Sequence, residues 1–498
     1  MEGVSNFTGI ICVKCRTKEP VNSPSPVCRK CGGRLEVVMD LEAAREKITK
    51  ESIRESKDRG VWKYRELLPL MNPKEIVSLG EGNTNLMRSE SLAQVLGMRK
   101  LFIKDETSNP SGSFLDRGTT VEVSRAKALG YRTIACGWSG NLASSSAAYC
   151  ARGGLRSRAY LPGQVDLGKL YQIVAYGAEI VPSVSREDAF RRVSERMGEH
   201  YPMTPRNAFF LEGIKTSGIE VLDQMDWSQP DWIVVPMGNG SHLSMIHKGL
   251  KDLETLGMIE RPRTHLLGVQ IEGCSPIVDL IKGQSGRSKH TATTFARDIA
   301  VEKPGMAEES MEAIRSSGGD AVVVTEKEIL DAVRSLASNE GIFAEPASAS
   351  TVAAVRNTLD SGTIGRSESV VCMITGMGLK DPTMARKLAS KNRAARSIIT
   401  RYEETPFTRR IGDTKLAILR MLQGEESYAY SIRKRLALEG RRISLVSVYQ
   451  HLSELENFGF IAVERHERTV EGRHRVYYAM TTRGQEILSS IAGSAVES

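Results

Sequence analysis

The stretch KDETSNPSGSFLDRG, residues 104–118, decides how this 498-residue chain is interpreted. It follows Leu101–Ile103, one of several short β-branched runs that alternate with helical segments between residues 85 and 395. The others are Thr133–Ala135, Ala159–Leu161, Glu179–Val181, Trp232–Val235, Leu267–Val269 and Val370–Met373. Such alternation predicts an α/β fold of βαβ units with a mostly parallel sheet, and it places ligands at the carboxyl ends of the strands. We therefore expect the stretch 104–118 to lie at a ligand site.

Two further loops follow predicted strands. Ser139-Gly140-Asn141 opens one helix, and the loop Pro236–Ser241 opens another. The glycines of the second loop let backbone N–H groups approach an anion at a helix start. Either loop alone is more often a plain strand-to-helix turn, but the two in this order are specific.

Together these segments resemble the threonine synthase branch of fold-type II pyridoxal-phosphate (PLP) enzymes. Residues 268–274, 340–349 and 375–382 extend the resemblance. It implies a fold-type II PLP-dependent architecture, with Asn141 at the 3-hydroxyl of the PLP ring and Thr375 at the pyridine nitrogen. The PLP phosphate would lie on the glycine-rich loop, which contributes Gly238, Asn239, Gly240 and Ser241.

Three positions depart from this family, and each has an apolar residue in place of a polar one. Leu115 stands where the family has the lysine that holds PLP as a Schiff base, and leucine has no amine for that bond or for proton transfer. Leu142 and Phe210 replace a hydroxyl and an arginine that in the family help to bind the phosphate of O-phosphohomoserine. We therefore predict no catalytic lysine and a site that binds PLP, or a PLP–amino-acid adduct, without covalent capture.

Two alternatives would preserve an active enzyme. Lys104, the nearest lysine in sequence, would take the place of Leu115, although the family also has a lysine there beside its catalytic one. Arg206 or Lys215 would compensate for the lost phosphate contacts. Under these alternatives the chain is a threonine synthase or a related lyase with an appended regulatory domain.

Four of the eight cysteines stand near the start of the chain as two pairs, Cys12-x-x-Cys15 and Cys28-x-x-Cys31. This spacing is typical of a zinc ribbon, because each pair can present two thiolates to one tetrahedral metal ion. Two disulfides are the alternative, which the lack of a secretory signal disfavours. We predict a structural Zn²⁺ ribbon, as in many threonine synthases.

Lys and Arg total 68 against 60 Asp and Glu, a net charge of +8, and arginines are frequent from residue 384 onward. No apolar run approaches membrane-spanning length, so we expect a cytoplasmic protein without a membrane partner. A chain of this length predicts several domains. We expect a zinc ribbon at 1–40, a PLP-binding domain at 41–383, a basic linker at 384–410 and a winged helix at 411–498.

Residues 411–498 have the helix–helix–helix–hairpin order of a winged helix. Leucines at 416, 419 and 422 mark the first helix, and Tyr430–Leu438 the second. Ser444–Phe458 forms the third, with Val448, Leu452 and Leu455 on its inner face, and Phe460–His466 and Val476–Met480 form the wing.

This region resembles PadR-type regulators in Ser447-Val448-Tyr449, Gly459-Phe460-Ile461 and Thr482-Arg483-Gly484. In winged helices the third helix enters the major groove and basic wing residues contact the DNA backbone. The candidate DNA contacts are Ser444, Ser447, Tyr449, Gln450, His451, Arg473 and Arg475. A protein-interaction or dimerisation module is the alternative. The basic wing favours DNA, and we predict a dimeric, ligand-responsive transcription regulator.

Overall fold

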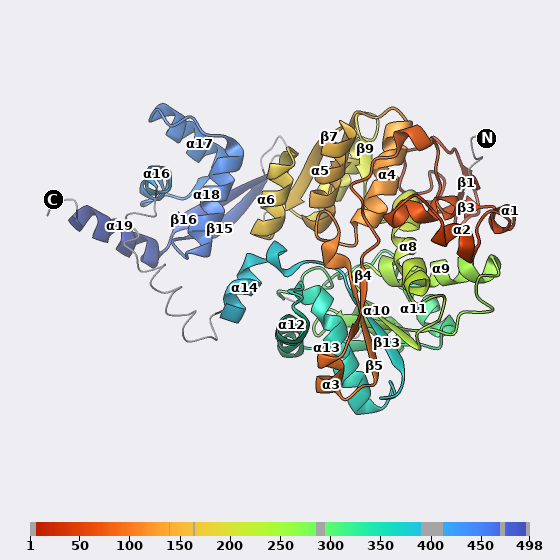
Figure 1. Cartoon of the computed structure of the whole chain (residues 1–498). Helices are drawn as coiled ribbons and strands as arrows, with labels where there is room; N and C mark the ends of the chain where they lie inside the picture. The colour runs from red at the N-terminus through yellow and green to blue at the C-terminus, as the bar shows by residue number, and fades with distance from the viewer. Residues whose placement is uncertain are drawn as a thin grey trace. The chain divides into compact units, whose positions relative to one another are not determined.

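The computed structural model describes residues 6–138, 140–162, 165–284, 294–389, 412–468 and 474–494. The chain forms two compact units, a first unit of residues 1–388 and a second unit of residues 389–498 (Figure 1). Among these described residues, no helix is both long enough and apolar enough to span a membrane.

A six-stranded sheet in the order β12-β11-β10-β13-β5-β4 forms one half of the first unit. Neighbouring strands are parallel except β4 and β5, which are antiparallel. The strands are β4 (Asn85–Ser89), β5 (Lys100–Asp105), β10 (Trp232–Pro236), β11 (His265–Ile271), β12 (Asp320–Val324) and β13 (Ser369–Ile374).

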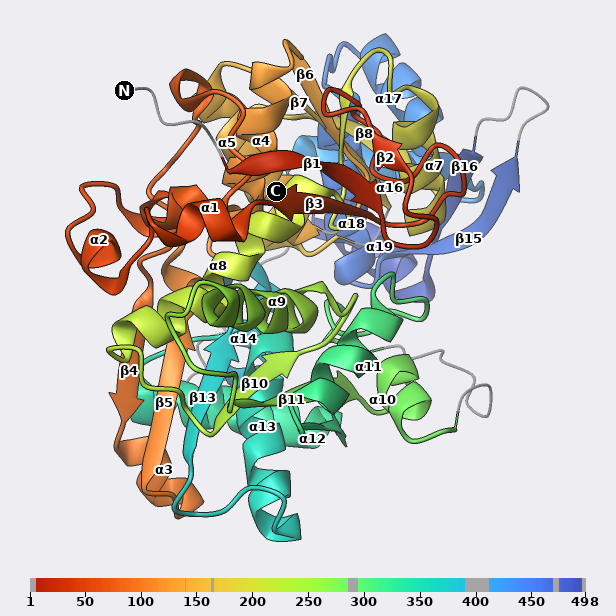
Figure 2. The same cartoon turned by 90° about the vertical axis from the view of Figure 1, so that its right-hand side faces the viewer.

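Both faces of this sheet are buried, as expected for a parallel sheet covered by helices. Val234 packs into the cluster that includes α12 (Glu326–Glu340) and α13 (Pro346–Ser361). Its neighbours Ile233 and Val235 point to the other face, into the cluster that includes α8 (Ala208–Gln224) and α9 (Ser241–Thr255). Figure 2 shows the helices around the sheet. The apolar runs of the sequence are therefore buried on alternate sides.

A second, four-stranded parallel sheet has the order β8-β7-β6-β9. Its strands are β6 (Thr133–Cys136), β7 (Arg156–Pro162), β8 (Glu179–Ser183) and β9 (Tyr201–Met203). The adjoining helices are α4 (Asp116–Ala128), α5 (Gly140–Gly153), α6 (Leu167–Ala175) and α7 (Arg186–Glu195). All seven predicted runs are strands, but they divide between two sheets, and β4, β9 and β12 are additional to them.

The cysteine pairs lie on a small antiparallel sheet in the order β2-β1-β3, formed by β1 (Phe7–Cys12), β2 (Lys18–Glu19) and β3 (Leu35–Met39). Its apolar side chains pack with Trp62 and Phe209 of the first unit. The remaining elements of this unit are α1 (Leu41–Arg45), α2 (Lys50–Arg54), η1 (Gly60–Leu67), η2 (Pro73–Glu75), α3 (Ser91–Leu96), η3 (Glu106–Ser108), α10 (Pro276–Ile281), α11 (Ala307–Ser316), η4 (Gly378–Lys380) and α14 (Pro382–Ala389).

The second unit has the helix order that the sequence predicts. Its elements are α16 (Asp413–Met421), β14 (Ser427–Tyr428), α17 (Ala429–Leu438), α18 (Leu445–Asn457), β15 (Ile461–Arg468), β16 (His474–Met480) and α19 (Thr482–Ser494). Val448, Leu452 and Leu455 are fully buried, which confirms the predicted inner face of α18. Strand β14 and helix α19 are additional. Most of the predicted linker, residues 390–410, lies outside the described residues.

Candidate functional site

The stretch 104–118 is attached to the segment after β13 by backbone hydrogen bonds. Phe114 N donates to Thr375 O at 3.0 Å, and Met377 N donates to Gly112 O at 3.0 Å. The Asp116 carboxylate accepts from Ser111 N at 2.6 Å and from Ser145 Oγ of α5 at 2.5 Å. These bonds hold Leu115 between Thr375 and α5. Three distant segments therefore meet at one place.

The three apolar replacements belong to one hydrophobic cluster. Leu142 and Phe210 are fully buried in it, and the partly buried Leu115 packs against it. A Cβ on Gly118 would stand 2.5 Å from the Phe210 ring, so glycine at that position makes room for the phenylalanine. These three side chains are part of a packed apolar surface, which offers a phosphate no hydrogen-bond donor.

The amine of Lys104 is fully engaged away from Leu115. Its Nζ donates to Thr84 O at 2.7 Å, to Glu220 at 2.6 Å and to Gln224 at 2.6 Å. Lys104 is also completely buried, and this burial lowers the pKa of its amine. An ammonium has three N–H donors, and all three are used here. This geometry opposes the alternative in which Lys104 replaces the missing lysine.

The two candidates for compensating cations differ. Lys215 is fully buried, and its Nζ donates to Glu212 and Asp252, each at 2.6 Å. Arg206 lies at Gly305, where a Cβ would meet the Arg206 Cδ at 3.1 Å and the Asn239 Oδ1 at 3.0 Å. Lys215 is thus committed to the core, whereas Arg206 lies at the glycine-rich loop.

That loop, residues 236–241, connects β10 to α9. Asn239 Oδ1 accepts from Gly305 N at 2.6 Å. Within the described ranges, the buried atoms Asn239 Nδ2 and Arg206 Nε have no hydrogen-bond acceptor. Two unpaired donors beside the start of a 15-residue helix suit an anion. Phe114, stacked on His242 with ring centroids 4.1 Å apart, connects this loop to the stretch 104–118.

Asn141, at the start of α5, lies in a group of charged side chains that the sequence analysis did not single out. Its Nδ2 donates to Glu345 Oε2 at 3.0 Å and to Asp298 Oδ2 at 3.1 Å. Lys169 Nζ lies 2.7 Å from Asp298 and 3.0 Å from Glu345. No motif marks Lys169 or Asp298, because only the folded chain brings α6 and residue 298 to Asn141.

The hydroxyl of Thr375 lies close to the same group. It is 2.8 Å from Ser348 Oγ of α13, and Ser348 Oγ also accepts from Gly376 N at 2.8 Å. Glu345 N donates to Gly376 O at 2.8 Å, which holds the Glu345 carboxylate beside this segment. The two predicted ring contacts, Asn141 and Thr375, are thus linked through Glu345. Ser139 lies outside the described residues.

The four N-terminal cysteines converge. Their Sγ atoms all lie within 4.8 Å of one another, with Cys12–Cys31 at 3.5 Å and Cys15–Cys28 at 3.7 Å. All four are free thiols. A Zn–S distance of about 2.3 Å in a tetrahedron implies sulfur–sulfur distances of roughly 3.8 Å. The cluster has the dimensions of a four-thiolate metal site and not those of two disulfides.

The candidate DNA contacts of the second unit have different surroundings. Ser444 is exposed and caps α18, accepting from Ser447 N at 3.0 Å. Gln450 Nε2 donates to Glu454 at 3.1 Å, and His451 Nδ1 lies 4.0 Å from Glu454. Tyr449 is half-buried against the core of the unit. Arg475 lies over the Tyr428 ring at 4.5 Å. Arg473 lies outside the described residues.

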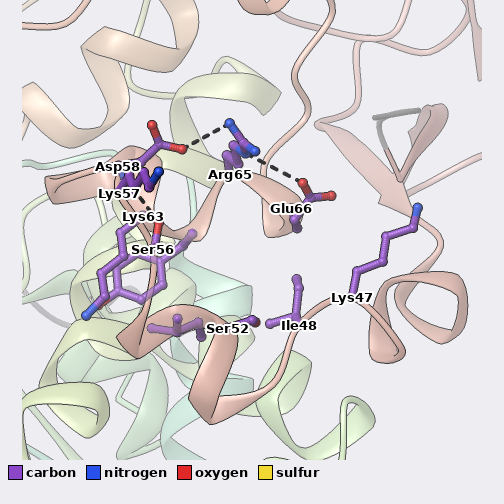
Figure 3. A pocket seen from close by; sticks show the side chains of 11 residues that line it. Lys47, Ile48, Ser52, Ser56, Lys57, Asp58, Lys63, Arg65 and Glu66 are labelled. Atoms are coloured by element: carbon purple, nitrogen blue, oxygen red, sulfur yellow. Dashed lines mark hydrogen bonds and ion pairs between the residues drawn. The ribbon is translucent and has the colours of Figure 1, made fainter. Parts of the chain in front are cut away.

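A cavity of about 420 Å³ lies elsewhere in the first unit, between α2 and η1 (Figure 3). Within it Arg65 pairs with Asp58 at 3.0 Å and with Glu66 at 3.6 Å. Its lining includes none of the predicted site residues. This cavity is therefore separate from the site formed by Asn141, Thr375 and the glycine-rich loop.

Comparison with known proteins agrees with this arrangement. Residues 77–376 match the family "Pyridoxal-phosphate dependent enzyme", and residues 418–490 match the "Transcriptional regulator PadR-like family". Threonine synthase of Methanocaldococcus jannaschii is 41% identical over 381 residues, which cover 75% of this chain and 93% of that protein. Threonine synthase of Methanosarcina acetivorans is 39% identical over 378 residues, 74% of this chain and 92% of that protein.

Solved structures share the fold at lower identity. Threonine deaminase isoform 2 from Solanum lycopersicum has a TM-score of 0.54 at 19% identity, covering 67% of this chain and 93% of that one. Maize serine racemase has a TM-score of 0.52 at 20% identity, covering 62% and 93%. The chain therefore belongs to the pyridoxal-phosphate-dependent enzyme family, in its threonine synthase branch, and it carries a PadR-like domain in its C-terminal part.

Proposed function

We propose that this protein is a transcription regulator whose first unit is a catalytically disabled, threonine-synthase-like sensor. The sensor binds PLP, an amino acid or their adduct without covalent capture, and the winged helix binds DNA. The main support for this proposal is that Leu115 packs with Leu142 and Phe210 in one apolar cluster. A homodimer in the cytoplasm is the form we expect, since winged-helix regulators commonly bind paired half-sites.

The residues around the glycine-rich loop fit PLP. Its phosphate would be held by the loop N–H groups, with the unpaired donors of Asn239 and Arg206 beside them. The Thr375 hydroxyl would accept or donate a hydrogen bond at the pyridine nitrogen. Bound PLP supplies an electron sink for chemistry at an amino acid's α-carbon. Leu115, however, moves no proton there, so the site is suited to binding rather than turnover.

Ligand binding in the first unit would change DNA affinity by favouring one arrangement of the dimer's two winged helices. Gel-shift titration of DNA selected from a random pool, with and without PLP and amino acids, tests this coupling. A DNA affinity that does not change with either ligand counts against a sensor. DNA binding itself has a sharper test.

Replacing both Arg441 and Arg442 by alanine is expected to weaken DNA binding and to reduce its salt dependence. These arginines lie just before α18, where basic groups contact phosphates. Each lost phosphate contact lowers the slope of log affinity against log salt by about 0.9, so the pair should lower it by about 2. Fluorescence anisotropy over a salt series measures the slope.

The matched control removes two exposed arginines, Arg191 and Arg263, from the first unit. It deletes the same charge, and its slope should equal that of the unmodified protein. Equal slopes for all three proteins would show that the residues preceding α18 do not contact DNA, and would favour a protein-interaction role for the second unit.

A second candidate function is an active threonine synthase, or a related lyase, with an appended regulatory domain. Its support is the 41% identity to the threonine synthase of Methanocaldococcus jannaschii, which extends over most of both chains. The two functions differ in whether a lysine forms a covalent bond to PLP. Borohydride reduction of the protein mixed with PLP distinguishes them, because only a covalent Schiff base is trapped on a lysine.

We also propose that Cys12, Cys15, Cys28 and Cys31 hold one structural zinc ion. Replacing the exposed Cys31 by serine should lower the zinc content well below about one per chain and the melting temperature of the first unit. The neighbouring exchange Lys30→Ser should change neither. Elemental analysis and thermal unfolding measure both, and a fully stable Cys31→Ser protein without metal would contradict a structural role.

A further inference from the structure

The group of charged side chains at Asn141 has an unpaired acceptor. Asn141 is 5% exposed. Its amide orientation is fixed by the carboxylate oxygens of Glu345 and Asp298 around Nδ2, because only the NH₂ end can donate to them. The other end of the amide, Oδ1, is buried and has no donor among the described residues. A buried acceptor of this kind calls for an N–H or O–H from a ligand.

Lys169 cannot supply that hydrogen. Its Nζ lies within ion-pair distance of three carboxylates, Asp166 at 2.9 Å, Asp298 at 2.7 Å and Glu345 at 3.0 Å. An ammonium has only three N–H groups, and these partners account for all of them. The Lys169 side chain also lies against Gly140, where a Cβ would stand 2.9 Å from its Cδ. Lys169 is therefore held in place by packing as well as by charge.

Among the described residues, acidic side chains outnumber basic ones in this group. The carboxylates are Asp116, Asp166, Asp298, Glu345 and Asp381, and the described cations that face them are Lys169, Lys380 and Arg297. Burial raises the pKa of Glu345, and the neighbouring Asp298 adds to this against the opposing effect of Lys169. A buried carboxylate with too little positive charge around it is stabilised by one more cation.

Solvent can reach this charge. The side chain of Asp298 keeps 27% of its surface exposed, whereas those of Glu345 and Lys169 keep 5% and 4%. The same residue borders the glycine-rich loop, since a Cβ on Gly238 would stand 2.2 Å from Asp298 O. Asp298 thus joins a region that attracts cations to one that attracts anions. The two regions together suit a zwitterion.

We propose that the first unit binds the primary ammonium of a free amino acid at Glu345 and Asp298, with Asn141 Oδ1 accepting its third N–H. The donors of the glycine-rich loop hold the anionic end. This inference rests on the proposed sensor function and names its ligand, and it places that ligand in the site without PLP. The amino group is bound as a cation and is not a reactant.

The test is calorimetric titration of the full-length, PLP-free protein with the standard amino acids. For the tightest one, the analogue lacking the amino group is titrated next, for example 3-hydroxybutyrate for L-threonine. At least one amino acid should bind, and its deamino analogue should bind at least about tenfold more weakly, because the carboxylates repel an anion that lacks the ammonium. Failure of every amino acid to bind, or equal affinity for the analogue, overturns the inference.

Glu345→Gln removes the charge with little change of shape. This exchange should weaken amino-acid binding at least about tenfold. It should also abolish the preference for the amino acid over its deamino analogue. Glu179→Gln is the matched control, because Glu179 is exposed, pairs with Arg158 and lies outside this charged group, and it should keep the preference for the amino acid over its deamino analogue. A merely structural role of Glu345 would lower the melting temperature without changing the preference.

The same titrations separate this inference from the proposed function. Amino-acid binding that requires PLP overturns the ammonium site and leaves the sensor hypothesis intact. Amino-acid binding without PLP that leaves DNA affinity unchanged supports the ammonium site and contradicts the sensor hypothesis.

Discussion

Borohydride reduction of the purified protein in the presence of PLP will leave no cofactor on any specific lysine. The residue between Phe114 and Asp116 is leucine. The Nζ of Lys104 donates hydrogen bonds to Thr84, Glu220 and Gln224, so it is not available to PLP. Intact mass and peptide mapping measure the result. A saturable change in the PLP absorption spectrum, without attached mass, is the expected signature of non-covalent binding.

The matched control is Leu115→Lys, which returns an amine to the loop between Thr375 and α5 and should become covalently labelled. PLP attached to a specific lysine of the unmodified protein would contradict the prediction and support an active enzyme. Lys380 is the lysine to examine first in that case, because burial lowers the pKa of its amine to about 8. Its Nζ donates to Ser111 O at 2.6 Å, within the same site.

Threonine synthesis separates the two functions in cells. Neither the unmodified protein nor Leu115→Lys should support growth of a threonine auxotroph, because the apolar side chains of Leu142 and Phe210 remain where the resemblance to threonine synthases predicts contacts to the substrate phosphate. Growth with the unmodified protein would contradict the proposal that the first unit is catalytically disabled. Growth with Leu115→Lys alone would show that the apolar cluster does not prevent phosphate binding.

Arg117→Met is expected to destabilise the first unit by about 3–5 kcal/mol. The Arg117 guanidinium is completely buried and bonds Glu106 at 2.7 Å and Glu220 at 2.7 Å, and both carboxylates are almost completely inaccessible. Methionine would leave two buried carboxylates with only the Lys104 ammonium beside them. Urea unfolding followed by a probe in the first unit measures the loss.

The effect of this exchange depends on pH in a defined direction. Burial by itself would raise the pKa of Glu106 and of Glu220, but Arg117 and Lys104 lower both below the ordinary value of 4.5. Groups with a lowered folded-state pKa stabilise the protein above that ordinary value and lose this contribution as the pH falls. The difference in the free energy of unfolding between the unmodified protein and Arg117→Met should therefore be largest near neutral pH and shrink in acid.

Arg263→Ala is the control for this experiment. It removes an exposed arginine whose partner Glu260 is also exposed. The free energy of unfolding should therefore change by less than about 0.5 kcal/mol. A loss below about 1 kcal/mol for Arg117→Met would mean that the carboxylates reach water or other partners after the exchange.

Sequence by itself determined the elements whose physics is local. The β-branched runs became strands because both faces of a helix-covered sheet accept apolar side chains, and the leucines of α16 and α18 became a core at helical spacing. The spacing of the cysteine pairs was sufficient to predict their convergence. The absence of an amine at position 115 needed no structure, since a leucine has no amine in any conformation.

Only the tertiary structure decided which groups surround that position. Lys169 on α6, Asp298 ahead of α11 and Glu345 before α13 meet Asn141 because the packing of the two sheets and their helices brings these segments together. Contacts of that range leave no periodic trace in sequence. The tertiary structure also decided the role of Lys104. This lysine is the nearest to Leu115 in sequence, but its amine donates a hydrogen bond to Glu220, 116 residues away. Burial and partner choice depend on the packing of whole elements, which the local pattern of residues does not encode.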